Sequence, residues 1–288
     1  MTVQAGIEPV RLIERLAHRN ALTVKFRDVH LDEPVTDGLA VRVVVAQSDR
    51  SFPAVRTTSG VYTVRSLPGL GPWQTRAVDE SGLEEQVTVR PFPVTVDVRD
   101  ELRRFLPCVI KALLPRDTLL GLDVGSPPSS LSPLSPPAGE DAAIPLYSAP
   151  TRPVPAGMAV VRASLVTPAG APAAYAALEV FPEDGVEPVR GVADERGQLA
   201  VLLRYPAPRR RLGSPPTATK QSLASSTWNV GLQAYLPRLP PGTPPQLELL
   251  VDQRPATLSS VFPPPEIHYG QECVLRSSAT HAELIVGS

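Results

Sequence analysis

The four histidines of this chain, His18, His30, His268 and His281, are the side chains best suited to acid–base or metal chemistry. A zinc site needs histidine or cysteine ligands at short characteristic spacings, and none of the four stands at such a spacing from a cysteine or another histidine. His268 lies beside Tyr269 and could line a pocket, but we favour an ordinary surface or edge-strand position. The histidines therefore predict no metal centre.

Two acidic turns offer oxygen ligands instead. Glu183-Asp184 and Asp194-Glu195 are paired carboxylates that could bind Ca²⁺. Calcium takes about six to eight oxygen ligands, which calls for a denser run of Asp and Asn than either turn has. We favour solvated turns over a calcium site.

The strongest basic cluster is a run of three arginines at residues 209–211, followed by Lys220. A loop that contacts phosphate is conceivable, but no aromatic side chains are interleaved for base stacking. We therefore favour a solvated loop. Trp73 and Trp228 suit either core packing or a platform for stacking sugars, and core packing is the interpretation we favour.

Sequence motifs for catalysis are absent from the chain. It has no Gly-x-Ser-x-Gly nucleophile elbow, no glycine-rich phosphate-binding loop and no His-Glu-x-x-His motif. We expect a protein that is not an enzyme, holds no cofactor or metal, and has no small-molecule ligand.

Two segments of similar pattern, residues 53–64 and 187–201, indicate the architecture that must position these side chains. Each reads as a strand, a polar turn containing glycine, and an alternating strand. Each also follows an apolar run, Leu39–Val45 in the first copy and residues 175–181 in the second. Many short strands between turn signals are typical of a β-sandwich. We predict an all-β fold of two β-sandwich domains, Ig-like or prealbumin-like, with one short N-terminal helix.

Composition supports two domains. A chain of 288 residues that is 42% hydrophobic can bury two cores of about 100–150 residues each. Its 35 prolines argue against long helices and central strands at most positions. Its 28 basic and 29 acidic residues nearly cancel, so no overall field attracts nucleic acid or an anionic membrane. We expect no nucleic-acid partner.

The predicted helix covers residues 8–20. Val10, Ile13 and Leu16 fall near one helical face and charged residues fall on the other. This helix would either pack on its own sandwich or dock into the groove of a partner. Both roles are kept as hypotheses.

The predicted domain boundaries follow changes in composition. The helix occupies residues 1–20, and the first β-sandwich occupies residues 21–123. A segment rich in Pro, Ser, Ala and Gly follows at 124–156, and it predicts an extended linker or an arm draped over a partner, anchored by Ile144, Leu146 and Tyr147. The second sandwich covers residues 157–288, with Leu247–Val251 and residues 257–261 among its predicted strands.

The two cysteines, Cys108 and Cys273, lie in different predicted domains. We favour buried free thiols over a disulfide between the domains. The first nine residues show no basic run followed by an apolar stretch, and no apolar segment approaches the length of a membrane span. We therefore expect a cytoplasmic protein without a membrane span, carried in a particle that is later released.

The second copy of the repeated pattern resembles a known module. Residues 161–180, continued by 193–201, resemble the carboxypeptidase regulatory-like (transthyretin-like) module in their small-residue stretch and acidic turn with glycine. The first copy, at residues 57–70, resembles the same hairpin, although Ser59 stands where an acidic residue is usual. The resemblance covers about half of the chain and implies a prealbumin-like scaffold or adhesive module without catalytic residues.

A second resemblance concerns use rather than fold. Residues 93–107 and 114–122 resemble accessory proteins encoded with phage-tail-like contractile injection systems. This implies a structural part of a large particle, at its baseplate, spike enclosure or cap.

Three hypotheses about function follow, from three different classes. We favour a structural subunit whose partners are other proteins of a large assembly. The alternatives are a pair of modules that bind carbohydrate or another surface, and an enzyme of unrecognised type. Protein contacts are expected at the residues that distinguish the two copies: Val10, Ile13, Leu16, Arg103, Arg104, Phe105, Ile144, Leu146, Tyr147, Arg209, Arg210 and Arg211.

Overall fold

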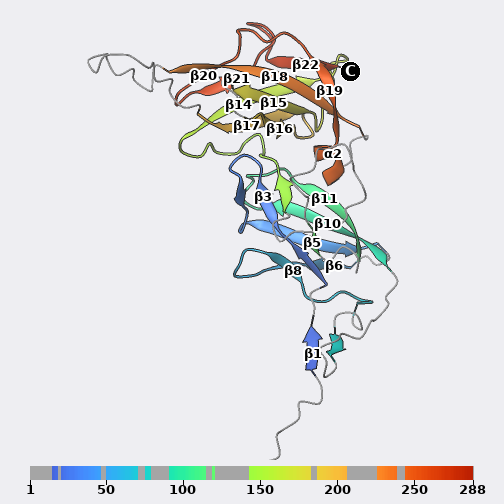
Figure 1. Ribbon diagram of the computed structural model, residues 1–288. Coiled ribbons are helices and arrows are strands. Elements are labelled where there is room, and N and C mark those ends of the chain that lie inside the picture. The colour runs from blue at the N-terminus through green and yellow to red at the C-terminus, as the bar shows by residue number, and fades with distance from the viewer. Residues whose placement is uncertain are drawn as a thin grey trace, which may run out of the picture.

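The computed structural model describes residues 15–18, 21–46, 50–70, 75–78, 91–114, 119–120, 143–182, 187–205, 226–238 and 244–287. Within these ranges the chain is mostly β, with several sheets and a single short helix. Figure 1 shows a first half, made by residues up to β13, and a second half, made by β14 onward, stacked end to end.

Two four-stranded sheets dominate the first half. One sheet has the antiparallel order β11-β10-β5-β6, from β5 (Leu39–Val45), β6 (Ser51–Pro53), β10 (Phe92–Asp100) and β11 (Cys108–Leu114). The other has the order β12-β2-β8-β7, from β2 (Leu22–Val24), β7 (Val55–Arg56), β8 (Tyr62–Val64) and β12 (Leu119–Leu120). Strand β10 alternates as its sequence predicts, because Val94, Val96 and Val98 are buried between less buried neighbours.

Two smaller sheets complete this half. One has three strands, β3 (Phe26–Asp28), β4 (Glu33–Pro34) and β13 (Ile144–Leu146), in the order β13-β3-β4. The other pairs β1 (Arg15–His18) with β9 (Thr75–Val78) in antiparallel register.

The second half is one curled sheet of nine strands. Its path is β16-β15-β18-β19-β22-β14-β17, with β20 beside β18 and β21 beside β14. The two ends of this path contact each other, since a methyl group added at Gly191 of β16 would lie 2.7 Å from Val201 Cγ2 of β17. The sheet therefore forms a half-barrel around its core. The strands are β14 (Met158–Val166), β15 (Ala177–Pro182), β16 (Val189–Val192), β17 (Gln198–Arg204), β18 (Thr227–Pro237), β19 (Gln253–Leu258), β20 (Glu266–His268), β21 (Glu272–Val274) and β22 (Glu283–Gly287).

The two halves share a hydrophobic core at their junction. The helix α2 (Leu247–Val251) belongs to the second half in sequence, but its leucines at 247, 249 and 250 pack into the core of the first half. Tyr175 and Val192 join the same core, and the Val109 backbone N–H donates a 2.8 Å hydrogen bond to the Pro245 carbonyl. Figure 1 shows α2 at this junction. Apolar contact, in addition to the chain connection, therefore joins the halves.

The predicted N-terminal helix over residues 8–20 is wrong where the structure describes it. Residues Arg15–His18 form β1, which pairs with β9 along its whole length. A helix of about 13 residues is marginal in water without a packed face, whereas β9 pairs with the backbone groups along one edge of β1. Val10 and Ile13 lie outside the described residues, and Leu16 is described as part of β1 only.

The predicted strand at Leu247–Val251 is also wrong, because these residues form α2. A short apolar run does not distinguish a buried strand from a buried helical turn. The helix is selected by the junction, where three leucines on one side of the turn fill the space beside β11.

The described end of the predicted linker differs from an extended arm. Residues 144–146 form β13, which runs parallel to β3, and Ile144, Leu146 and Tyr147 are buried in the chain's own core. The Leu106 backbone N–H donates to the Tyr147 carbonyl at 2.9 Å. Pairing with β3 satisfies backbone groups that an arm would leave to water. Residues 124–142 lie outside the described ranges.

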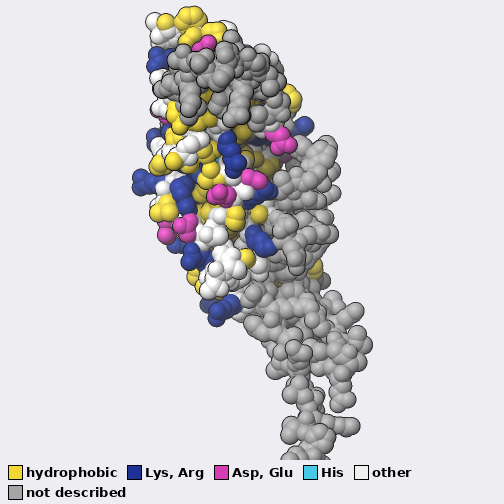
Figure 2. Space-filling view, turned by 60° about the vertical axis from the view of Figure 1, so that its left-hand side comes forward, with side chains coloured by type: hydrophobic (Ala, Val, Ile, Leu, Met, Phe, Trp, Pro, Cys, Tyr) yellow, Lys and Arg dark blue, Asp and Glu magenta, His cyan; other side chains and the backbone are white. Residues whose placement is uncertain are grey.

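Charged side chains are mixed over the visible surface. On the face shown in Figure 2, basic and acidic groups are interspersed among apolar ones. Among the described helices, none has the length and apolar character to cross a membrane.

Candidate functional site: a buried charge cluster and a junction cleft

A buried cluster of four side chains ties β3 to the segment that follows β13. The cluster consists of Asp28, His30, Ser148 and Arg152, which are 3%, 7%, 0% and 5% exposed. Arg152 forms an ion pair with the Asp28 carboxylate through Nη2, and its Nη1 donates to Ser148 Oγ at 2.8 Å. Asp28 Oδ1 also accepts the His30 backbone N–H at 2.9 Å. Each charge is thereby paired inside the protein, as burial requires.

His30 is neutral in this cluster. Its Nδ1 lies 3.0 Å from Ser148 Oγ, and because Arg152 already donates to that oxygen, the hydroxyl hydrogen is available to His30. Burial, and secondarily the Arg152 charge, lower the pKa of His30 to about 4, against the opposing effect of Asp28. Its Nε2 is buried without a hydrogen-bond partner among the described residues. A proton on His30 would therefore be poorly solvated.

The residue types of this cluster match a catalytic triad, but their geometry does not. Ser148 is fully buried, so its Oγ is closed to a substrate. Asp28 contacts His30 through the backbone N–H instead of orienting the ring through a ring nitrogen. The cluster is suited to holding two chain segments together.

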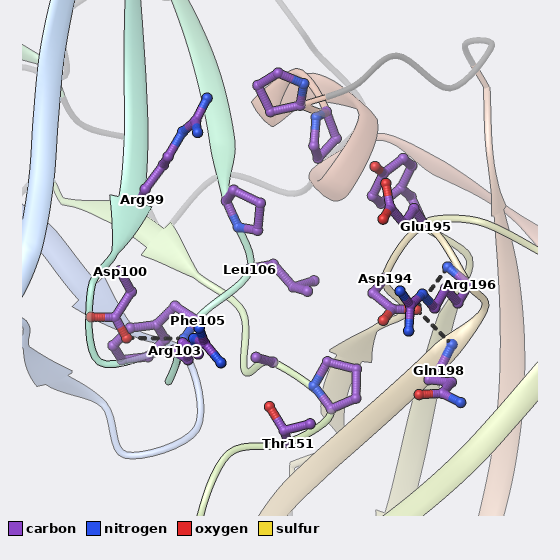
Figure 3. A pocket seen from close by; sticks show the side chains of 16 residues that line it. Arg99, Asp100, Arg103, Phe105, Leu106, Thr151, Asp194, Glu195, Arg196 and Gln198 are labelled. Carbon is purple, nitrogen blue, oxygen red and sulfur yellow. Dashed lines mark hydrogen bonds between the residues drawn. The ribbon is translucent and has the colours of Figure 1, made fainter.

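Beside this cluster lies an open cleft of about 510 Å³ between the two halves, which we call the junction cleft. Its walls come from the β10–β11 turn, the segment after β13, the β16–β17 turn and the prolines before α2. Figure 3 shows the β10–β11 turn facing the β16–β17 turn across this space. Phe105, Leu106 and Pro107 contribute an apolar part of the lining. A cleft of this size accepts a small molecule or a few residues of a peptide.

Two of the acidic side chains around the cleft are occupied by the protein itself. The Asp100 carboxylate accepts Arg104 Nε at 3.1 Å and the backbone N–H of Phe105 at 3.2 Å. The Asp194 carboxylate accepts the backbone N–H groups of Arg196 and Gln198 at 2.8 and 2.9 Å. These carboxylates hold the two turns in shape, as side chains commonly do in tight turns. Gly197 completes the second turn with φ +76°, where an added methyl would collide with the Leu165 carbonyl.

Unlike these two carboxylates, the side chains of two of the three arginines that line the cleft are not bonded to other described residues. Arg103 and Arg196 both line the cleft from exposed positions, and within the described ranges neither side chain has a hydrogen-bond or ion-pair partner. Arg99 also lines it but is paired with Asp97 at 3.2 Å. The exposed Glu195 is an acidic group of the lining without a partner in the described part of the chain. Within the described ranges, the unpartnered charged side chains of the cleft are therefore the two arginines and Glu195.

The predicted contact residues 103–105 differ in exposure and in their bonding partners. Arg103 faces the cleft, whereas Arg104 is bound to Asp100 and Asp37 and braces the β10–β11 turn. Phe105 is 5% exposed, and the Arg104 and Arg152 guanidinium groups lie 5.3 and 4.8 Å from its ring centre. These neighbours in sequence thus have different roles.

Other predicted residues are partly outside the described ranges and partly buried. Residues 209–211, Lys220, Trp73 and Glu183-Asp184 lie outside the described residues. Trp228 is 8% exposed, and Cys108 is buried, which raises the pKa of its thiol to about 12. Both cysteines are free. Across the described ranges, no group of three or more His, Cys, Asp or Glu side chains has the arrangement of a metal site.

His30 and the Asp194-Glu195 turn were named from the sequence, but Asp28, Ser148 and Arg152 of the cluster and Arg196 of the cleft were not identified. Asp28 and Arg152 are 124 positions apart in sequence, and no local pattern relates them. Arg196 was visible only as part of an acidic turn with glycine. The turn itself could have indicated that Arg196 is exposed. An Asp two residues before it bonds to the Arg196 backbone N–H, and such compact turns project the following side chains outward.

Comparison with known proteins found no matching family model, no similar curated protein and no similar solved structure.

Proposed function

We propose that this protein is a non-catalytic structural component of a large protein assembly. The baseplate, spike enclosure or cap region of a phage-tail-like contractile injection particle is the setting we favour. The observation that carries the proposal is the shared core at the junction, where α2 of the second half packs into the first half. Two halves joined by a buried apolar interface move as one body. Such a body suits a part that holds neighbouring subunits at fixed positions.

The buried cluster supports a structural role for the polar residues as well. Its Ser, His and Asp side chains are closed to solvent and bonded to one another or to Arg152. The groups best suited to catalysis in the described residues therefore stabilise the fold in this arrangement. The partners we propose are other protein subunits, met in the cytoplasm and carried in a particle that is later released.

We also propose a finer description of the fold. Each half would be a β-sandwich of the Ig-like or prealbumin-like kind, with the half-barrel of β14–β22 as a strongly curled example. Support comes from the antiparallel pairing in the first half and from the alternating burial of β10.

Sedimentation of a native lysate from cells that carry a tagged copy of this chain tests the proposed function. The tagged chain is expected in megadalton fractions together with the other proteins of one particle. A chain found only as a free monomer would contradict the proposal. A tagged chain with Leu102→Ala, a change at an exposed position, is the matched control and should sediment like the unaltered chain.

A second candidate, a carbohydrate-binding module, has one specific observation in its favour. Tyr205, Tyr269 and Trp228 form an aromatic cluster, with ring centres 4.8 Å apart for the tyrosines and 5.5 Å apart for Tyr205 and Trp228. Tyr269 is 38% exposed, so the tyrosines, and not Trp228, offer a stacking face. Glycan binding that disappears in Tyr269→Ala would support this candidate, and an absence of glycan binding by the unaltered protein would remove it.

A further inference from the structure

The junction cleft offers two unpartnered arginines to an anionic ligand. Four segments from both halves form its walls, the Asp100 carboxylate is paired with Arg104, and the Asp194 carboxylate accepts backbone N–H groups of its own turn. Arg103 and Arg196 remain without partners in the described part of the chain. An anionic group would supply the partners that these guanidinium groups lack.

The two arginines come from opposite walls. Arg103 belongs to the β10–β11 turn of the first half, and Arg196 belongs to the β16–β17 turn of the second half. Figure 3 shows these two turns on either side of the cleft. A ligand that engaged both would need more than one anionic group, or one group at each end of a longer body.

The backbone at Arg103 supports a role for its side chain. Arg103 has φ +56°, a left-handed conformation that is costly for residues other than glycine. The Asp100 side chain and the Arg103 backbone N–H, which donates to the Asp100 carbonyl at 3.1 Å, hold the turn in this form. The conformation fixes the point from which the guanidinium group reaches into the cleft.

Part of the lining of the cleft is apolar. Phe105 and Leu106 are each 5% exposed and line the cleft with Pro107, and Pro244 and Pro245 line it from the second half. This lining favours an apolar body between charged ends, since it offers few groups to hydrogen-bond a polar one. An inorganic anion alone would use the arginines and leave the apolar lining uncovered.

We propose that the junction cleft binds an extended acidic segment of a partner protein, with its carboxylates on Arg103 and Arg196 and an apolar side chain between them. This proposal rests on the proposed function, since it names the chemistry by which one assembly partner is held. A segment that contacts both halves would also fasten the junction from outside. Charge complementarity sets specificity and association rate in such contacts.

A displayed library of random 12-residue peptides is the probe for this proposal. The unaltered protein is expected to enrich peptides in which Asp or Glu alternates with apolar residues. Arg103→Gln/Arg196→Gln should lose this enrichment, while Arg254→Gln, an exposed arginine outside the cleft, should keep it. Failure to enrich acidic peptides, or equal enrichment by Arg103→Gln/Arg196→Gln, would overturn the proposal.

The best enriched peptide is then measured by fluorescence anisotropy. Its affinity should fall at least about tenfold in Arg103→Gln/Arg196→Gln, and by a similar factor when its acidic residues are changed to amides. Citrate and phosphate at matched charge should compete weakly. Full competition by either ion would show a small-anion site and overturn the peptide proposal. Because the lysate sedimentation does not depend on these variants, failure here leaves the proposed function testable by itself.

Discussion

The buried cluster and the junction cleft both contain aspartate and arginine side chains, but Arg152 is paired in the cluster, whereas the Arg103 and Arg196 side chains of the cleft have no partner among the described residues. In the cluster, Asp28 and Arg152 are almost wholly buried and neutralise each other. In the cleft, Asp100 and Asp194 are occupied by their own turns, and Arg103 and Arg196 are left open. Pairing and burial, not residue type, therefore distinguish charge that stabilises the fold from charge available to a ligand.

The largest effect should come from breaking the buried pair. Arg152→Met leaves the Asp28 carboxylate buried without its cation, which should reduce the free energy of unfolding by about 3–5 kcal/mol. Urea unfolding followed by circular dichroism measures this loss. In the control Asp28→Asn/Arg152→Met no unpaired charge remains, and at least half of the loss should be recovered. A single variant as stable as the unaltered protein would show that the cluster contributes nothing.

Acidification should have the next largest effect, through His30. Its pKa is about 4 in the folded protein and 6.5 when unfolded, so between these values the unfolded chain binds more protons. The stability present above pH 6.5 is therefore lost as the pH falls toward 4, by about 2 kcal/mol from His30 between pH 7.5 and 5.

Urea titrations at several pH values, compared with His30→Gln, isolate this contribution. Asp28 and Arg152 are the charged groups that act on the His30 pKa, and both are retained in His30→Gln. His268→Gln, at an exposed histidine, is the matched control and should keep the full pH dependence. An unchanged slope in His30→Gln would contradict the neutral, buried assignment.

Substitution of the two neighbouring arginines of the β10–β11 turn should have smaller effects on stability, and the two effects should differ. Arg104→Gln loses the bonds to Asp37 and to the buried Asp100 carboxylate, and stability should fall by about 1–2 kcal/mol. Arg103→Gln loses no partner within the described part of the chain, and the change should stay within about 0.5 kcal/mol. Differential scanning calorimetry of both variants measures the difference in stability. Equal losses of stability would contradict the assignment of a bracing role to Arg104 alone.

Local patterns predicted the strands well where one face is buried. The apolar run Leu39–Val45 of the first copy forms strand β5 with the same bounds. The helix expected at residues 8–20 and the strand expected at Leu247–Val251 failed for a shared reason. Their structures depend on distant partners, β9 in one case and the first-half core in the other.

Dependence on distant parts of the chain also explains why the sequence predicted only part of the candidate site. Arg103 was named from the sequence as an expected protein contact, but nothing local separates it from Arg104, whose carboxylate partner Asp37 is 67 positions away. Arg196 could be found as a turn residue, and only the fold brings that turn to face Arg103. Ile144 and Leu146 were predicted to anchor an arm and to contact a partner, but they are buried in the chain's own core, in a strand that pairs with β3.

One paired measurement tests the central claim that stability and recognition reside in different charges. The free energy of unfolding and the affinity for the selected acidic peptide are measured for Arg152→Met and for Arg103→Gln/Arg196→Gln. We expect a large loss of stability in the first variant, and in the second a loss of affinity with stability unchanged within about 0.5 kcal/mol. A loss of stability in Arg103→Gln/Arg196→Gln comparable to that of Arg152→Met, with peptide affinity retained, would contradict this claim.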